Sequence, residues 1–207
     1  MKRQNYKNRI IDQQVEEYLK AFGAVCIEGP KWCGKTWTSS YHSKSAIYIE
    51  GPAGSFQNRQ LAELSPALVL EGETPRLIDE WQEVPTLWDA VRFKVDQTTQ
   101  KGQFILTGSA TPNHKGILHS GAGRIARLRM RTMSLWESGD STGEVSLERL
   151  CHGELKPVMS GDVGLIKLII RGGWPGSLGL PEKQAKLLPA EYLNAVIDDD
   201  VYRIDGV

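Results

Sequence analysis

The sequence lacks an apolar stretch long enough to cross a membrane, and it lacks an excess of charge of either sign. A membrane-spanning helix needs roughly 18 or more consecutive apolar residues, and the polar N-terminus has no apolar core of a secretory signal. Lysine and arginine total 25, as do aspartate and glutamate, so the net charge of 0 gives no global electrostatic reason to bind nucleic acid. These absences predict a cytoplasmic protein with no membrane partner.

Cysteine is scarce, and its spacing is irregular. The three cysteines are Cys26, Cys33 and Cys151. An odd number without paired spacing indicates reduced thiols rather than a disulfide framework. Cys151 precedes His152, but a zinc site needs a second ligand pair, so we interpret this doublet as a chance neighbour.

Short apolar runs alternate with amphipathic stretches along the first two thirds of the chain. With 207 residues, 40% of them hydrophobic, the chain can form one good-sized domain or one and a half. The pattern predicts an α/β fold with a mainly parallel sheet. Strands are expected over 24–28, 46–50, 76–80, 103–107 and 125–133, and helices over 9–22, 35–41, 55–64 and 87–98.

The motif Gly-x-x-x-x-Gly-Lys-Thr follows the first predicted strand and opens the second predicted helix. In such a P-loop, backbone N–H groups surround the β-phosphate, and the helix N-terminus adds about half a positive charge. Lys35 reaches the β- and γ-phosphates, and the Thr36 hydroxyl is a Mg²⁺ ligand. The residues predicted to bind nucleotide are Gly29, Pro30, Lys31, Trp32, Cys33, Gly34, Lys35, Thr36 and Trp37.

Two positions of this loop carry unusually large or reactive side chains. Trp32 is expected either to cover the nucleotide and pack on its base, or to shield the loop from water. Cys33 is expected to be sensitive to alkylation, because the positive field of the loop lowers the pKa of a thiol.

An acidic pair, Asp79-Glu80, ends the third predicted strand. Ligands of parallel sheets bind at the carboxyl ends of the strands, so this pair is expected near the P-loop. Asp79 is predicted to hold Mg²⁺ through water or through Thr36, and Glu80 to polarise the water that attacks the γ-phosphate. A second carboxylate favours hydrolysis, although a small-molecule kinase could use it to activate a hydroxyl.

Further candidates follow the fourth strand and precede the fifth. Thr107 or Ser109 is predicted to place a hydroxyl between the γ-phosphate and the attacking water. Arg124 follows a Gly-rich loop and is a candidate arginine finger, for its own site or for that of a neighbouring subunit; the alternative is a surface arginine. The alternating Arg127, Arg129 and Arg131 form a basic strand face, either solvated or in contact with nucleic acid.

Taken together, these motifs resemble bacterial and archaeal AAA-superfamily ATP-binding proteins that carry a C-terminal domain of unknown function. The resemblance implies an ATPase core with an additional-strand glutamate and the sheet order 5-1-4-3-2. It also implies full-length members about twice as long as this chain, with a C-terminal domain similar to restriction endonucleases. The segments that carry it are 9–11, 28–36, 77–82, 105–109, 121–125, 133–137 and 171–176.

The texture of the sequence changes after residue 138. Residues 139–144 are polar and contain glycine, and helices are expected over 163–170 and 183–197. We therefore predict a P-loop ATPase domain over 1–138. We interpret 139–207 as a helical segment, either lid-like or the start of a truncated C-terminal domain of a longer protein.

Three functions remain open at this point. The first is an ATPase that uses ATP and Mg²⁺ to drive or regulate another macromolecule, a protein or nucleic-acid client, with a homo-oligomer as one expected assembly. The second is an ATP-dependent scaffold or DNA-associated module with little hydrolysis. The third is a small-molecule kinase, which Arg171-Gly172-Gly173 would serve as a lid. The chain has no Asn-Lys-x-Asp guanine motif, which argues against a GTPase.

Overall fold

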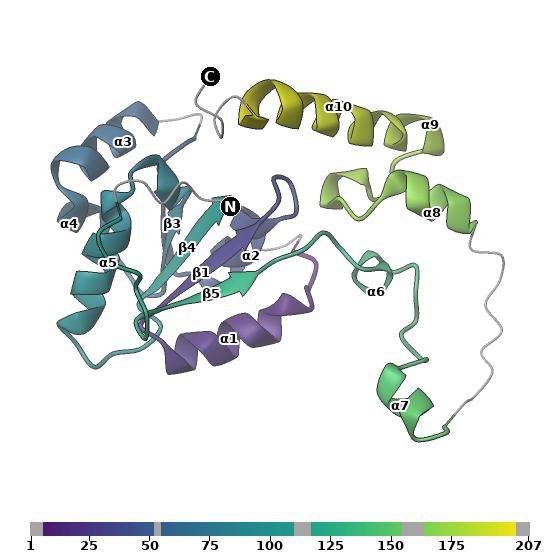
Figure 1. The fold of residues 1–207 in the computed structure, drawn as a ribbon, viewed down its shortest axis with the longest axis horizontal. Helices are drawn as coiled ribbons and strands as arrows, with labels where there is room; N and C mark the ends of the chain where they lie inside the picture. Colours follow the sequence, from purple (N-terminus) through teal and green to yellow (C-terminus); the bar gives the residue numbers. More distant parts are fainter. Residues whose placement is uncertain (1–5, 52–54, 110–116, 155–163, 202–207) are drawn as a thin grey trace. The chain divides into compact units, whose positions relative to one another are not determined.

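The computed structural model describes residues 6–51, 55–109, 117–154 and 164–201, and the chain divides into two compact units. The first unit is Met1–Arg131 and the second is Thr132–Val207. Figure 1 shows the elements of each unit in order along the chain. The first unit ends a few residues before the predicted boundary at residue 138, and the functional identity of 139–207 stays a prediction.

The first unit is built on a five-stranded sheet in which every strand pair is parallel. The strand order β2-β3-β4-β1-β5 confirms the expected order 5-1-4-3-2, counted from the opposite edge. The fifth strand ends at Arg129 rather than at Met133, so Arg131 lies outside it. The strands are β1 Ala24–Gly29, β2 Ser45–Tyr48, β3 Arg76–Asp79, β4 Phe104–Ser109 and β5 Ile125–Arg129.

Helices cover both faces of this sheet (Figure 1). One face is covered by α1 (Ile11–Ala21) and α2 (Lys35–His42), which contact β1 and each other. The other face is covered by α3 (Ser55–Leu64), α4 (Pro66–Val69), the 3-10 turn η2 (Trp81–Glu83) and α5 (Thr86–Asp96). The short apolar run at residues 68–70 therefore begins in a helix, and a proline at the first turn favours it.

The strands are apolar on both faces because both faces are buried. Successive side chains alternate, so Cys26 points toward α5 while Val25 and Ile27 point toward α1 and α2. The α5 side has the larger aromatic content, because Trp81 and Trp88 are fully buried there with ring centroids 4.8 Å apart. This alternation also places Asp79 and Thr107 on the α2 side, the side on which the P-loop opens its helix.

The second unit is helical, and a few contacts join its short helices and turns. A capping box joins Ser134 and Glu137, the Met133 N–H donates to the Gly173 carbonyl, and the ring of Trp174 packs on that of Tyr192. The predicted helix over 183–197 is two helices followed by a π-helical turn. The elements of the second unit are α6 Leu135–Ser138, α7 Leu147–Cys151, α8 Leu165–Arg171, η3 Pro175–Ser177, α9 Glu182–Ala185, α10 Leu187–Ala195 and η4 Val196–Val201.

Helix length bears on the membrane question. Within the ranges that the structure describes, no helix combines the length and the apolar character needed to cross a bilayer.

Candidate functional site

The predicted P-loop connects β1 to α2 at the carboxyl edge of the sheet. Strand β1 lies between β4 and β5, so the loop emerges where the neighbouring strands also end. Gly34 caps the helix with φ 103°, a left-handed conformation that glycine adopts without steric cost. The first helical residue is Lys35, so the positive end of α2 points at the loop.

Lys35 lies inside the loop rather than in solvent. Lys35 is buried, with a relative exposure of 6% for the whole residue. The ammonium Nζ donates to the carbonyl oxygens of Gly29 and Pro30, each at 3.0 Å. The charge of Lys35 is therefore already placed within the curve of the loop, where the sequence predicts that phosphate groups bind.

The side chain of Arg9 holds the loop in place, a role that the sequence did not predict. Its guanidinium is buried, and it donates from Nη1 to the Cys33 carbonyl at 2.7 Å and from Nη2 to the Arg131 carbonyl at 2.8 Å. One side chain thus ties the phosphate loop to the end of the first unit. The segment Arg9-Ile10-Ile11 stood out only through its resemblance to the family, because a contact spanning 122 residues leaves no local pattern.

The loop side chains divide into buried and exposed ones. Trp32 is 61% exposed and has φ 66°, and Trp37 is 45% exposed on the first turn of α2, so both are accessible to a ligand. Cys33 is fully buried, and burial raises the pKa of its thiol despite the nearby Lys35. The expectation of an alkylation-sensitive Cys33 is therefore wrong, because loss of hydration outweighs the positive field.

Asp79 and Thr107 meet behind the loop. The Thr107 hydroxyl donates to Asp79 Oδ1 at 2.6 Å, and Thr36 also hydrogen bonds to the Asp79 carboxyl group. Asp79 is 5% exposed and Thr107 is fully buried. The arrangement joins the ends of β3 and β4 to the start of α2, and its hydroxyl and carboxylate oxygens are the ligand types that Mg²⁺ prefers.

Glu80 follows in an unusual backbone conformation. Its φ of 56° and ψ of 50° lie in the left-handed region, which is costly for a residue with a Cβ atom and is typical of functional sites. The Glu80 N–H donates to the Thr107 hydroxyl at 3.1 Å, and Gln82 Nε2 donates to Glu80 Oε2 at 2.5 Å. Thr107 therefore fixes both members of the acidic pair.

Burial raises the pKa of both acidic residues, Asp79 and Glu80. Burial raises the pKa of Asp79, against the hydrogen bonds from Thr107 and Thr36 and the charge of Lys35. Burial likewise raises the pKa of Glu80, and the hydrogen bond from Gln82 offsets part of the rise. A carboxylate with a raised pKa is a better acceptor for a proton from water.

The structure does not bring Arg124 to the other predicted residues. It precedes β5, whose first residue pairs with Ala24 at the amino edge of the sheet, whereas the P-loop follows Gly29 at the carboxyl edge. The five-residue rise from Ala24 to Gly29 along β1 is about 16 Å. Arg124 Nε instead donates to Asp96 Oδ1 at 2.7 Å, so a role in its own site does not fit this arrangement. Ser109 ends β4, but its side chain lies outside the described residues.

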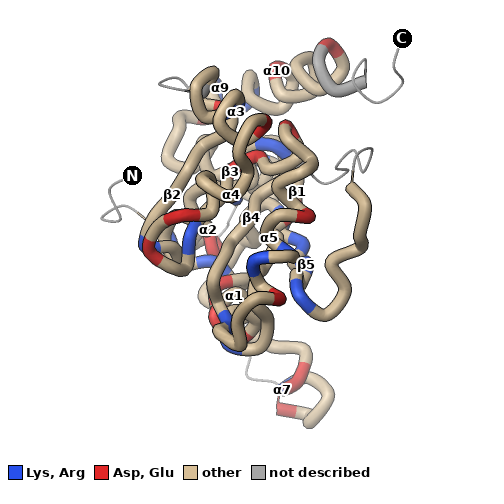
Figure 2. Tube along the Cα trace, turned by 90° about the vertical axis from the view of Figure 1, so that its left-hand side faces the viewer, with Lys and Arg blue, Asp and Glu red and all other residues tan. Residues whose placement is uncertain are grey.

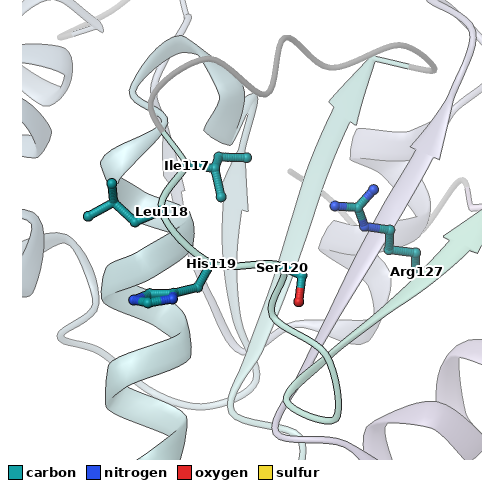
Figure 3. A pocket seen from close by; sticks show the side chains of 5 residues that line it. All are labelled: Ile117, Leu118, His119, Ser120 and Arg127. Carbon is teal, nitrogen blue, oxygen red and sulfur yellow. The ribbon is translucent and has the colours of Figure 1, made fainter.

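The basic strand face is partly engaged within the first unit. Arg127 lies 3.7 Å from Glu28 and its guanidinium lies 4.9 Å from the centre of the Trp88 ring. Figure 2 shows basic positions along β5, with acidic and basic positions interspersed elsewhere. Arg127 also lines a hollow of about 300 Å³ with residues 117–120 (Figure 3), and that lining contains none of the predicted nucleotide-binding residues.

Comparison with known proteins gives a family and two uncharacterized relatives. The chain is 31% identical over 126 residues to an uncharacterized protein of Mycobacterium tuberculosis and, equally, to one of Mycobacterium bovis. The match covers 58% of this chain, and the chain spans about a quarter (27%) of the length of these relatives. Residues 21–138, more than half of the chain, match the model of a family described as AAA domain. These residues include the P-loop, the acidic pair and the strand that carries Thr107, and the chain belongs to the AAA domain family.

Proposed function

We propose that this protein binds ATP with Mg²⁺ in the P-loop and hydrolyses it to ADP and phosphate, to drive or regulate another macromolecule. The observation that carries the proposal is the contact of Thr107 with both Asp79 and Glu80, directly behind a P-loop that encloses Lys35. Binding alone would not need a second, conformationally strained carboxylate. Membership of the AAA domain family supports nucleotide binding independently.

The nucleotide would be held mainly by the loop. The phosphates would replace the Gly29 and Pro30 carbonyls as acceptors for Lys35 Nζ, with the N–H groups of residues 31–36 around the β-phosphate. Thr36 and Asp79 would hold Mg²⁺, which would neutralise charge on the phosphate oxygens. Trp32 and Trp37 are exposed beside the loop, where either could pack on the base.

Glu80 would act as the acceptor for the proton of the attacking water. As the water oxygen bonds to the γ-phosphorus, its proton passes to Glu80, and the bond to the β-phosphate oxygen breaks to release ADP. The buried position of Glu80 favours this proton transfer because its pKa is raised. Thr107 or Ser109 would sense the γ-phosphate, and Arg124 would act only on the site of a neighbouring copy.

The substitution Glu80→Gln tests this proposal. The variant should bind ATP as the parent protein does but lose turnover by about 100-fold or more, the contribution typical of a positioned base. The matched control is Glu63→Gln, because Glu63 lies on α3 and pairs with Arg59 at 3.3 Å on the surface. Phosphate release and binding of a fluorescent ATP analogue would be measured in parallel. Unchanged turnover in Glu80→Gln would rule out the assigned mechanism.

The alternative functions have less support from the geometry. A DNA-associated module would use the exposed arginines of β5, but Arg127 is already engaged with Glu28 and Trp88, and the chain has no net positive charge. A kinase would need Arg171 in a lid over the phosphates. Arg171 instead donates to Asp140 at 2.7 Å inside the second unit. Neither contact favours the alternative it concerns, so we retain the hydrolase proposal.

A further inference from the structure

Gln82 reaches back from the turn after β3 to the carboxylate of Glu80. Its Nε2 donates to Glu80 Oε2 at 2.5 Å, within the 3-10 turn η2. The turn is anchored by Trp81, which is fully buried and packs on Trp88. The position of the Gln82 amide is therefore set by the core of the first unit rather than by solvent.

The other end of this amide is an unexplained feature of the site. Gln82 Oε1 is buried and has no hydrogen-bond partner in the described structure, an arrangement that costs stability. A buried, unpartnered oxygen is not expected of a side chain kept for stability alone. The amide is held by its contact with Glu80, because turning it over would place Oε1 against the carboxylate.

The neighbouring strand leaves room for this amide. A Cβ atom on Gly108 would lie 2.9 Å from Gln82 Oε1 and 2.9 Å from Trp81 Nε1, closer than real Cβ atoms approach other atoms. Gly108 follows Thr107, which fixes the backbone of Glu80 from the same strand. Two consecutive residues of β4 thus act on this turn. Thr107 accepts a hydrogen bond from the Glu80 N–H, and Gly108, which has no side chain, leaves space for the Gln82 amide.

We propose that Gln82 is a positioning residue for hydrolysis, which holds Glu80 Oε2 so that Glu80 Oε1 faces the attacking water. The inference rests on the proposed ATPase activity and assigns to Gln82 no contact with the nucleotide. The left-handed backbone of Glu80 and the amide of Gln82 together set the direction of the carboxylate. Proton transfer requires this direction to be held closely, since small misplacements of a reacting group are costly.

The substitution Gln82→Met separates positioning from support of the fold. Methionine has a similar length and volume but cannot donate to Glu80, and it removes the unpartnered oxygen. We expect kcat to fall about ten- to hundredfold, while KM and ATP-analogue binding stay unchanged and the midpoint of thermal unfolding does not decrease. A residue with a purely structural role would give the reverse pattern, a lower midpoint with unchanged kcat, and that result would overturn the inference.

The matched control is Gln103→Met. Gln82 is half-buried and Gln103 is buried, and Gln103 Nε2 donates to the Thr98 hydroxyl and the Gln100 carbonyl, both at 3.0 Å, at the amino edge of the sheet. This variant should lower the unfolding midpoint and leave kcat unchanged. An equal loss of kcat in both variants would also contradict a specific role for Gln82.

Two further variants keep the test independent of one substitution. Gln82→Glu retains the shape but places a second carboxylate beside Glu80, and Gly108→Ala displaces the amide without altering it, so both should lower kcat with binding retained. In a Glu80→Gln background, Gln82→Met should cause no further loss of the residual turnover, because it acts through Glu80. An additional loss there would show an independent role and overturn the inference.

The same measurements distinguish this inference from the proposed function. Absence of turnover in the parent protein would remove the ATPase proposal and, with it, the role of Gln82. Turnover that is lost in Glu80→Gln but kept in Gln82→Met would leave the ATPase proposal intact and remove only the role of Gln82.

Discussion

The two compact units of this chain are stabilised in different ways. The first encloses fully buried aromatic residues, Trp81, Trp88 and Phe104, between a parallel sheet and its helices. In the second, the buried apolar residues among those described are Met133 and Ala185. Its other contacts include the ion pair of Arg171 with Asp140 at 2.7 Å and the packing of Trp174 on Tyr192.

Exposed apolar side chains occur in both units, and in the first unit Phe56 and Leu64 are 72% and 86% exposed. Helix α8 carries Leu165, Ile166 and Ile169, each more than 60% exposed, so its apolar residues lie largely outside any core. The residues of the candidate site belong to the first unit, where packing fixes their side chains. A site of this kind needs the packed core of the first unit around it, because the carboxylates of Glu80 and Asp79 must be held to within a fraction of an ångström.

The largest expected difference between the units concerns independent folding. A fragment of residues 1–131 should unfold cooperatively, because it keeps the whole sheet and the core on both of its faces. A fragment of residues 132–207 should show helical circular dichroism at most, without a sharp thermal transition, because small apolar cores rarely stabilise a fold. Thermal scans of the two fragments at equal concentration measure this directly. A cooperative transition in the second fragment would show that its ion pair, hydrogen bonds and ring contact suffice to fold it.

A pair of leucines tests the same comparison inside the intact chain. Leu87 is fully buried in α5, whereas Leu187 begins α10 and is 63% exposed. Leu87→Ala should lower the free energy of unfolding by about 2–5 kcal/mol through lost burial and a cavity. Leu187→Ala should change it by less than about 0.5 kcal/mol. Urea denaturation provides both values, and equal losses would mean that α10 has a packed core of its own.

The leucine pair also shows what the sequence could predict. The amphipathic spacing around Leu87 predicted α5, and short apolar runs predicted all five strands, because burial on two faces leaves a clear pattern. The strand ends were less certain: the pairing of β5 with β1 ends at Arg129, although the alternation in the sequence continues to Met133. The helix predicted over 183–197 is present but interrupted at Lys186, a feature that periodicity does not detect.

The candidate site was predictable in its parts and less so in its geometry. The motif gave Lys35 and Thr36, and strand ends gave Asp79, since parallel strands bring their carboxyl ends together. The same rule, applied to Arg124, places it at the opposite edge, which motif order alone did not reveal. The left-handed backbone of Glu80 and the long-range contacts of Arg9 depend on tertiary packing and have no local signature.

Each unit has an arginine whose guanidinium makes polar contacts: Arg9 is buried in the first unit, and Arg171 is partly exposed in the second. Arg9→Met leaves the carbonyls of Cys33 and Arg131 without this donor, and it should cost about 2 kcal/mol of stability and weaken ATP binding. Arg171→Met breaks the pair with Asp140 on a partly exposed surface, and it should cost about 1 kcal/mol without affecting binding. Denaturation and titration with an ATP analogue measure both effects. Unchanged ATP binding in Arg9→Met would mean that the P-loop does not depend on Arg9, and equal losses in both variants would mean that the effect is not specific to Arg9.

The smallest effect concerns the segment before α1, which is fixed to the first unit although it has no regular structure. Asp12 accepts hydrogen bonds from the Arg9 N–H at 2.7 Å, the Tyr6 hydroxyl at 2.5 Å and His42 at 3.1 Å. Burial alone would raise the pKa of Asp12, but the hydrogen bonds from His42, Arg9 and Tyr6 together lower it. The carboxylate therefore contributes stability that is complete above its ordinary pKa, near 4, and is lost as the pH falls through the lowered folded-state value.

Asp12→Asn tests whether this contribution is electrostatic. The variant should be about 1 kcal/mol less stable at neutral pH, because the amide is uncharged and accepts fewer hydrogen bonds. Since protonation removes the same charge from the parent protein, the difference should narrow as the pH falls below about 4. Urea midpoints measured for both proteins from neutral to acidic pH provide the comparison. A difference that stays constant with pH would mean that Asp12 acts through packing, and that the segment is fixed by the stacking of Tyr6 on Tyr41, whose ring centroids lie 4.2 Å apart.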